Sequence, residues 1–240
     1  MNKLSRSLIP IVGLAAVVAA VVLVGDGPAV VTAQGSGESE GEAMAGGGEP
    51  AAGSGAEGPS AARDILGADL ETAIELASRT PDEWDYDPAE RTIHDEDAAL
   101  DYPLELPEAE WQELLDPDSY YILRQKGTEP AFTHPLNDNE REGIYYSKAT
   151  GQPLFSSEDK YESGSGWPSY TKPINPRAIV YVEDNSLFAR RIEVVDSLSG
   201  SHLGHVFSDG PEPTGQRYCI NGAALVFVAE GEEPPEIRRP

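Results

Sequence analysis

Short runs of apolar residues alternate with turn-forming residues over the second half of the chain. The runs at 178–182, 189–195 and 223–228 are rich in Ala, Val, Ile and Phe. Runs of this length, bounded by turn residues, are typical of β-strands. The pattern predicts a mainly β domain with antiparallel strands over residues 101–232, followed by a tail at 233–240. The turn clusters, rich in Asn, Asp, Gly and Pro, lie at 137–139, 175–176, 183–185 and 209–211.

A helix is predicted near the start of this domain. Residues 106–111 hold one proline and two glutamates. Proline fits the first turn of a helix, and carboxylates favour its positive N-terminal end. Trp111, Leu114 and Leu115 then share one helical face. We expect Pro117 to end this helix.

Residues 34–100 differ in composition from the domain that follows. Between residues 34 and 62 nearly all positions are Gly, Ser, Glu or Ala, and residues 80–100 are acidic and rich in turn formers. Such segments bury too little apolar surface to offset the entropy of ordering. We expect a flexible acidic linker, interrupted by one short helix over 64–79. The apolar residues at helical spacing are Leu66, Leu70, Ile74 and Ala77, with Ile65 and Leu76 outside that face.

The first 33 residues have the pattern of a targeting segment. Lys3 and Arg6 precede an apolar run at 8–24, and the small residues at 31–33 suit a signal peptidase. The run is long for a signal peptide and short for a membrane span. A cleaved signal peptide and an uncleaved membrane anchor both stay open, and we favour the signal. Either one predicts an extracytoplasmic protein, periplasmic, secreted or anchored by this segment.

Charge and cysteine content exclude several classes of function. The chain has 42 acidic and 17 basic residues and a net charge of −25, so it would repel the phosphates of nucleic acids. The charge indicates solubility; a saline habitat is a weaker second interpretation. Cys219 is the only cysteine, which excludes an internal disulfide and any zinc site with several thiolates.

Three clusters of residues suggest chemistry. In 163–170, two glycines permit a tight loop that can present Trp167 to a ligand. His202, His205 and Asp209 combine two groups that exchange protons near neutral pH with one carboxylate. Structural histidines or a weak metal site are the competing interpretations of that cluster.

The third cluster surrounds the cysteine. Arg217, Cys219 and Asn221 alternate, so a strand would place them on one face. A lone cysteine is usually a buried apolar residue. Here the guanidinium of Arg217 would favour the thiolate, which is the nucleophilic form. We therefore expect Cys219 to be reactive.

The order of six motifs resembles that of the B-type methionine sulfoxide reductases, which reduce peptide methionine (R)-sulfoxide. The resemblance covers residues from about 104 to 228, roughly half of the chain. It implies a fold of two antiparallel β-sheets with short peripheral helices, which agrees with the strand pattern. The motifs are Gly127-Thr-Glu, Gly143-Ile-Tyr, Pro153-Leu-Phe, Gly166-Trp-Pro-Ser, His202-Leu-Gly-His-Val-Phe and Arg217-Tyr-Cys-Ile-Asn.

The resemblance assigns a role to each candidate residue. It makes Cys219 the nucleophile that becomes a sulfenic acid, and Arg217 the residue that favours the thiolate. Trp167 and Phe207 would bind the substrate. The polar residues that would hold the sulfoxide oxygen or its water are His202, His205, Asp209 and Asn221.

The chain also departs from that family. Many relatives bind structural zinc through two Cys-x-x-Cys pairs; the corresponding residues here are Ser147, Thr150, Asp196 and Ser199, so no metal is expected. Ser165 occupies the position of the resolving cysteine. The resemblance therefore implies an external thiol as reductant, such as thioredoxin, glutaredoxin or a small thiol, and no other cofactor. The expected partners are oxidised proteins or peptides, with a membrane only through an uncleaved N-terminus.

Two other functions fit parts of the pattern. The chain could be a binding module that recognises oxidised methionine without turnover, or an exported protein that binds metal through its histidines. The complete set of Cys219, His202, His205 and Asn221 favours the enzyme over both, because a binding module needs no nucleophile.

Overall fold

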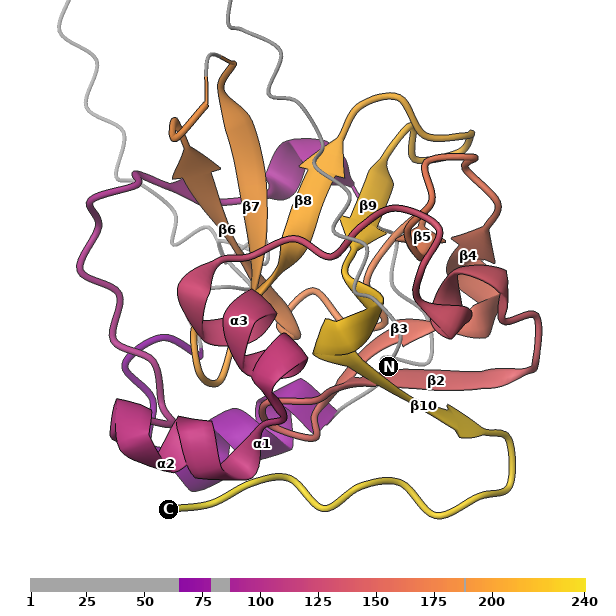
Figure 1. The fold of residues 1–240 in the computed structure, drawn as a ribbon. Coiled ribbons are helices and arrows are strands. Elements are labelled where there is room, and N and C mark those ends of the chain that lie inside the picture. The colour runs from indigo at the N-terminus through magenta and orange to yellow at the C-terminus, as the bar shows by residue number, and fades with distance from the viewer. Residues whose placement is uncertain (1–64, 79–86, 188) are drawn as a thin grey trace, which may run out of the picture. The chain divides into compact units, whose positions relative to one another are not determined.

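A computed structural model of the protein describes residues 65–78, 87–187 and 189–240 (Figure 1). The expected signal peptide or anchor and most of the expected linker lie outside the described residues. Within them, no helix is long and apolar enough to cross a membrane.

Two β-sheets form the body of the domain, as the sequence predicts. All neighbouring strands are antiparallel except β1 and β6, which are parallel. In order across the large sheet, the strands are β1 (Ile93–His94), β6 (Ile179–Asp184), β7 (Arg191–Asp196), β8 (His202–Phe207), β9 (Arg217–Ile220), β5 (Ser169–Tyr170) and β4 (Lys160–Tyr161). The small sheet contains β10 (Leu225–Ala229), β2 (Gly143–Ser147) and β3 (Pro153–Ser156).

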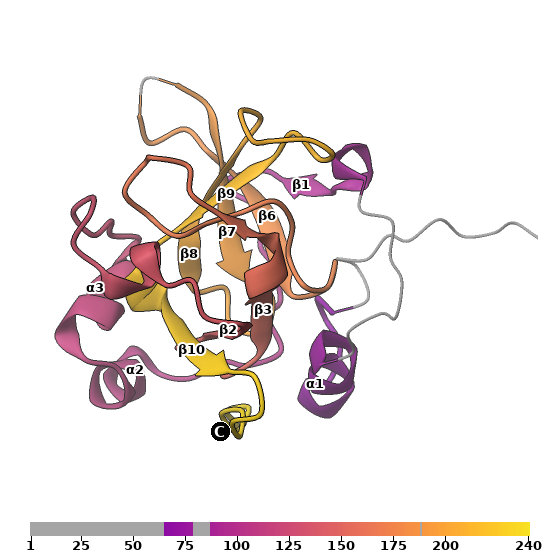
Figure 2. The ribbon, with the colours of Figure 1, turned by 90° about the vertical axis from the view of Figure 1, so that its right-hand side faces the viewer.

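Short helices surround the sheets (Figure 2), with α2 and α3 on one side of the strands and α1 on the other. The predicted helix is α2 (Glu108–Leu114). The structure adds α3 (Pro117–Gln125), because Pro117 begins a helix rather than only ending one. The Asp116 side chain caps α3 by accepting a hydrogen bond from the Ser119 amide at 3.0 Å. The 3₁₀ turns are η1 (Pro88–Glu90), η2 (Pro135–Asp138), η3 (Ser157–Asp159) and η4 (Gly222–Ala224).

The described part of the expected linker contributes packed elements. Helix α1 (Leu70–Ser78) lies inside the range predicted for a helix, and its Ala73 and Ala77 are buried in the core. Ile65, expected outside the apolar face, is fully buried. It precedes the helix in a turn, where helical spacing does not decide orientation. The Asn175 amide donates to the Leu76 carbonyl at 3.0 Å, which ties the end of α1 to the domain.

Strand β9 separates the core from the opposite face of the large sheet. Tyr218 and Ile220 are fully buried in the apolar core, where burial stabilises each side chain by about 1.5–3 kcal/mol. Tyr218 shares a hydrogen bond of 2.7 Å with Tyr181. Because side chains alternate along a strand, Arg217 and Cys219 point to the other face. The core therefore fixes β9 while leaving these two side chains for chemistry.

Candidate active site

Cys219 lies in a row of cross-strand neighbours on the polar face of the large sheet. Ser169 on β5 and His205 on β8 are its direct partners in the strand register. Directly opposite residues of antiparallel strands have Cβ atoms about 4.5–5.5 Å apart. The row continues to Tyr161 on one side and to Glu193 on the other. The fold thus places the thiol beside an imidazole that is distant in sequence.

The Cys219 thiol is partly buried, and its burial raises its pKa. The hydroxyl of Ser165, 3.9 Å from the sulfur, and the guanidinium of Arg217 act in the opposite direction. Asp209 raises the pKa further. Arg217 therefore acts to lower the pKa of Cys219, but burial has the larger effect and the pKa is raised on balance.

Arg217 is held in one orientation by Asp209. Its Nε and Nη2 donate to the two carboxylate oxygens at 2.9 and 2.8 Å, and these bonds lower the pKa of Asp209. The guanidinium also lies over the ring of Phe207, 4.4 Å from its centroid. Three of the candidate residues therefore form one cluster beside the thiol. Both carboxylate oxygens of Asp209 are already engaged there.

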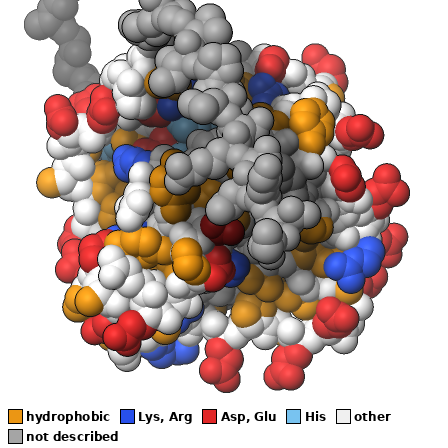
Figure 3. All heavy atoms as spheres, in the orientation of Figure 1, with side chains coloured by type: hydrophobic (Ala, Val, Ile, Leu, Met, Phe, Trp, Pro, Cys, Tyr) orange, Lys and Arg blue, Asp and Glu red, His pale blue; other side chains and the backbone are white. Residues whose placement is uncertain are grey.

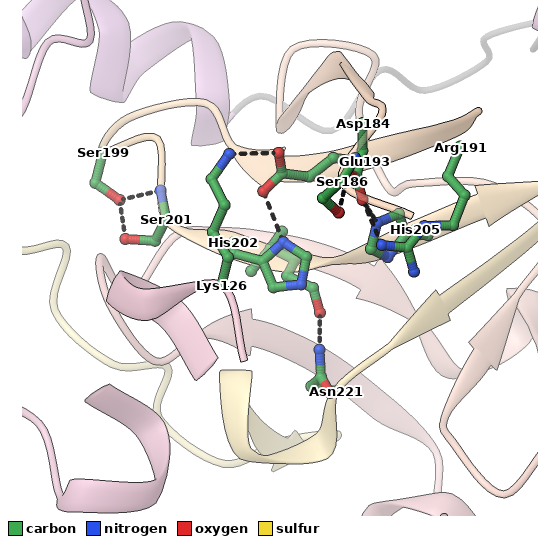
Figure 4. A network of polar contacts seen from close by, with 11 residues as sticks. Lys126, Asp184, Ser186, Arg191, Glu193, Ser199, Ser201, His202, His205 and Asn221 are labelled. Carbon is green, nitrogen blue, oxygen red and sulfur yellow. Dashed lines mark hydrogen bonds and ion pairs between the residues drawn. The ribbon is translucent and has the colours of Figure 1, made fainter. Parts of the chain in front are cut away.

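His202 is buried against a carboxylate that the sequence analysis missed (Figure 4). Its Nδ1 lies 2.7 Å from Oε1 of Glu193, and Lys126 donates to the other oxygen at 2.9 Å. Burial alone would raise the pKa of Glu193, but His202 and Lys126 together lower it. Nε2 of His202 is buried and has no hydrogen-bond partner among the described residues. It is the ring nitrogen that Glu193 leaves unengaged.

His205 has a similar arrangement with a second carboxylate. Its Nε2 lies 2.7 Å from Oδ2 of Asp184, which also accepts a hydrogen bond from Arg191 at 2.5 Å. Burial lowers the pKa of His205, and the nearby charges of His202 and Arg191 add to this, while Asp184 opposes them. His205 is therefore neutral at pH 7. The rings of His202 and His205 lie 5.4 Å apart, so both carboxylates support one polar site.

Asn221 lies just beyond β9, where the chain turns into η4. Its amide nitrogen donates to the Leu203 carbonyl at 3.0 Å, and its oxygen accepts from the Glu129 amide at 3.1 Å. The Glu129 carboxylate in turn accepts from the amides of Gly222 and Ala223 at 2.6 and 2.9 Å. Asn221 thus connects β8, β9 and the loop at 128–133. In this structure it positions these elements.

Trp167 is attached to the same loop. Its Nε1 donates to the Glu129 carbonyl at 3.1 Å, and the indole is only partly buried. Further along the loop, the Phe132 amide donates to the Gly166 carbonyl at 2.8 Å. Phe132 is 70% exposed and has a φ of 63°, a conformation that costs a non-glycine residue roughly 1–3 kcal/mol. Two aromatic residues therefore border the site: Phe132, which belongs to this loop, and Trp167, which is hydrogen-bonded to it.

A surface hollow of about 440 Å³ is lined by Ser165 and Arg217, the two residues that lie beside the Cys219 thiol. Its wall also includes Asp209 and Tyr161. The Tyr161 hydroxyl is buried without a hydrogen-bond partner in the described part of the chain. The hollow therefore adjoins the neighbours of the thiol, while Cys219 itself is not part of its lining.

The four positions that correspond to zinc ligands in relatives hold a hydrogen-bonded cluster. Thr150 donates to one oxygen of the buried Asp196 carboxylate at 2.7 Å, and Ser199 donates to the other at 3.2 Å. The Ser147 hydroxyl accepts from the Thr150 amide at 3.2 Å. One carboxylate and three neutral hydroxyls do not fit zinc, which prefers thiolate and imidazole. The described residues also contain no other group of three or more His, Cys, Asp or Glu arranged for a metal.

The partners of the candidate residues were not predicted from the sequence. Glu193, Asp184 and Glu129 each contact a candidate side chain, and Lys126 contacts Glu193. Two signals for them were available. Glu193 is an acidic residue inside an apolar run at a position that a strand buries, and Glu129 belongs to the Gly127-Thr-Glu motif.

Comparisons with known proteins agree on one family. Residues 115–229 match the SelR domain. The chain is 53% identical over 133 residues to the peptide methionine sulfoxide reductase MsrB of Methanosarcina mazei, which covers 55% of this chain and 95% of that protein. It is 49% identical over 131 residues to the MsrB of Leptospira interrogans, covering 55% of this chain and all of that protein. The MsrB of Acinetobacter baylyi is 52% identical over 129 residues, covering 54% and 93%.

Proposed function

Because the chain belongs to the MsrB family of peptide methionine sulfoxide reductases, we propose that it reduces methionine (R)-sulfoxide in peptides to methionine. The observation that carries this is the register of β8 and β9, which places the Cys219 thiol directly opposite His205. The nucleophile can then attack the sulfur of the sulfoxide while proton-exchanging groups meet its oxygen.

The reaction transfers one oxygen atom. The sulfur of Cys219 attacks the substrate sulfur, and the sulfur–oxygen bond of the sulfoxide breaks as oxygen passes to Cys219. Methionine leaves reduced by two electrons, and Cys219 becomes a sulfenic acid, oxidised by two electrons. The thiol and its proton balance the step: Cys–SH and sulfoxide give Cys–SOH and methionine. Because burial raises the pKa of Cys219, the thiolate must form as the substrate binds.

The sulfoxide oxygen needs a proton donor, because protonation makes the substrate sulfur electrophilic. We assign this role to Nε2 of His202. The Glu193 carboxylate holds the ring at Nδ1, and Nε2 has no hydrogen-bond partner among the described residues. His205 is neutral, because burial lowers its pKa, and it orients the oxygen or accepts the thiol proton.

An external thiol completes the cycle in this proposal. It attacks the sulfenic acid and releases water, and a second thiol then reduces the mixed disulfide. The position of Ser165 beside Cys219 and the hollow of about 440 Å³ support such access. The basic start and the apolar run at 8–24 support export, which would make oxidised extracytoplasmic proteins the substrates. A native N-terminus near Gln34 in mass spectrometry is the expected result, and an intact Met1 in a soluble cytoplasmic form would contradict export.

The test of the proposed function is Cys219→Ser, assayed on both epimers of a methionine sulfoxide peptide. We expect wild type to reduce the R epimer and the variant to keep less than about one-hundredth of that activity with its fold intact. Ser169→Ala, a neighbour on β5, is the matched control. A wild-type protein that binds the peptide without releasing methionine would support a binding module instead.

A further inference from the structure

Among the described residues, Phe132 has the most exposed large apolar side chain. Its side chain is 70% exposed, and its φ of 63° lies in the left-handed region that bulky residues avoid. Burial does not account for an aromatic residue held in this way. Strained residues of this kind concentrate where a protein binds a ligand.

The ring has a fixed place beside the proposed active site. The Phe132 amide donates to the Gly166 carbonyl at 2.8 Å. A Cβ atom on Gly166 would lie 2.8 Å from Cδ2 of Phe132, so the ring lies directly against this glycine. The next residue is Trp167, and the preceding residue, Ser165, lies 3.9 Å from the Cys219 sulfur. One short loop therefore connects the exposed ring to the nucleophile.

The segment that carries Phe132 is also rigid. Glu129 begins it and is bonded through its backbone to both Asn221 and Trp167. Its carboxylate accepts hydrogen bonds from the amides of Gly222 and Ala223. A ring held in advance loses little entropy when it binds a partner. Pro130, exposed in the same segment, adds a second apolar surface.

From this geometry we infer that Phe132 is a subsite for the peptide chain next to the oxidised methionine, and that it selects substrates with an apolar neighbouring residue. The inference depends on the proposed sulfoxide reduction. A sulfoxide side chain that reaches Cys219 leaves its own backbone at the surface, beside Trp167 and Gly166. The adjacent residue of the substrate then meets the exposed ring of Phe132.

The test uses Phe132→Asn, because asparagine tolerates the left-handed conformation and removes the apolar ring. Steady-state kinetics are measured with three substrates: N-acetyl-methionine sulfoxide amide, a peptide with leucine on both sides of the sulfoxide, and the same peptide with serine there. For the leucine peptide we expect KM to rise roughly tenfold with kcat unchanged. For the serine peptide and the small amide, KM should change less than about twofold. Leu114→Ala, an exposed apolar residue on α2, is the matched control.

The outcomes separate this inference from the proposed function. If wild type fails to reduce the small amide, the proposed function is wrong. If wild type reduces it and Phe132→Asn affects all three substrates equally, Phe132 only supports the loop and the subsite is refuted. Phe132→Leu, which keeps an apolar side chain, should retain most of the preference for the leucine peptide; its loss would also count against the subsite.

Discussion

Glu193 on β7 and His202 on β8 form a buried pair, with 2.7 Å between Oε1 of the carboxylate and Nδ1 of the imidazole. Both side chains are only 3% exposed. An unpaired carboxylate buried this deeply would destabilise the fold by several kcal/mol. Here both oxygens are paired, one with His202 and the other with Lys126. The pair fixes Nδ1 of His202 as the hydrogen-bonding nitrogen, and Nε2 has no hydrogen-bond partner among the described residues. On the face drawn in Figure 3, acidic side chains are spread along the rim, whereas Glu193, like Asp196, is buried.

Replacing Glu193 tests the role of this pair. Glu193→Gln keeps the size and a hydrogen bond but removes the negative charge beside His202. We expect kcat/KM to fall roughly 10–100-fold, because the His202 ring loses its charged partner. Glu183→Gln, which removes a partly exposed carboxylate paired with Arg190, should leave kcat/KM unchanged. A kcat/KM of Glu193→Gln within about twofold of wild type would show that Glu193 has no part in the reaction.

Arg217 sets the reactivity of the thiol. Because it lowers the pKa of Cys219 against the effect of burial, Arg217→Gln should raise that pKa further. The rate of alkylation by iodoacetamide at pH 7.5 should fall roughly threefold or more, since only the thiolate reacts. Asp209→Asn should lower the pKa of the thiol and increase the alkylation rate, because Asp209 raises that pKa. Arg190→Gln is the surface control, and equal rates in all four proteins would contradict this account.

Ser165 lies where the resemblance expects a resolving cysteine, and it tests the proposal that an external thiol reduces the oxidised enzyme. Its hydroxyl lies 3.9 Å from the Cys219 sulfur, whereas a disulfide needs about 2.05 Å. Ser165→Cys should therefore form an internal disulfide with a small movement of the loop. After one turnover without added thiol, wild type should hold a sulfenic acid that a cyclic diketone traps, and the variant should hold a disulfide. Ser78→Cys at the end of α1 is the control, and repeated wild-type turnover without thiol would contradict the scheme.

Asp196 is the centre of a buried cluster of hydrogen bonds. It is fully buried and accepts hydrogen bonds from the Thr150 hydroxyl and the amides of Leu198 and Ser199 at 2.7–3.0 Å. Asp196→Ala leaves these donors unpaired, so we expect urea unfolding to show a loss of roughly 2–5 kcal/mol. Asp118→Ala is the exposed control. Elemental analysis of wild type should find no stoichiometric zinc, and one zinc per chain that survives dialysis would contradict this account.

The sequence by itself determined the strands and the reactive motif. Strands β6, β7 and β10 follow from apolar runs between turn residues, because apolar patterning and turn formation are local properties of the chain. The alternation within 217–220 also placed Cys219 and Arg217 on one face. The capping signal of α3 is also present in the sequence, as Asp116 followed by Pro117, and a proline after one helix can begin the next one.

Only the tertiary structure decided which groups act on one another. Glu193 meets His202, and Asp184 meets His205, through the register of strands that local periodicity does not specify. The direction of the Cys219 pKa shift depends on how far burial outweighs the guanidinium, and burial is a property of the packed domain. Residue order supplies the chemical groups. Packing decides their partners and their charge, because both depend on distances between residues far apart in the chain.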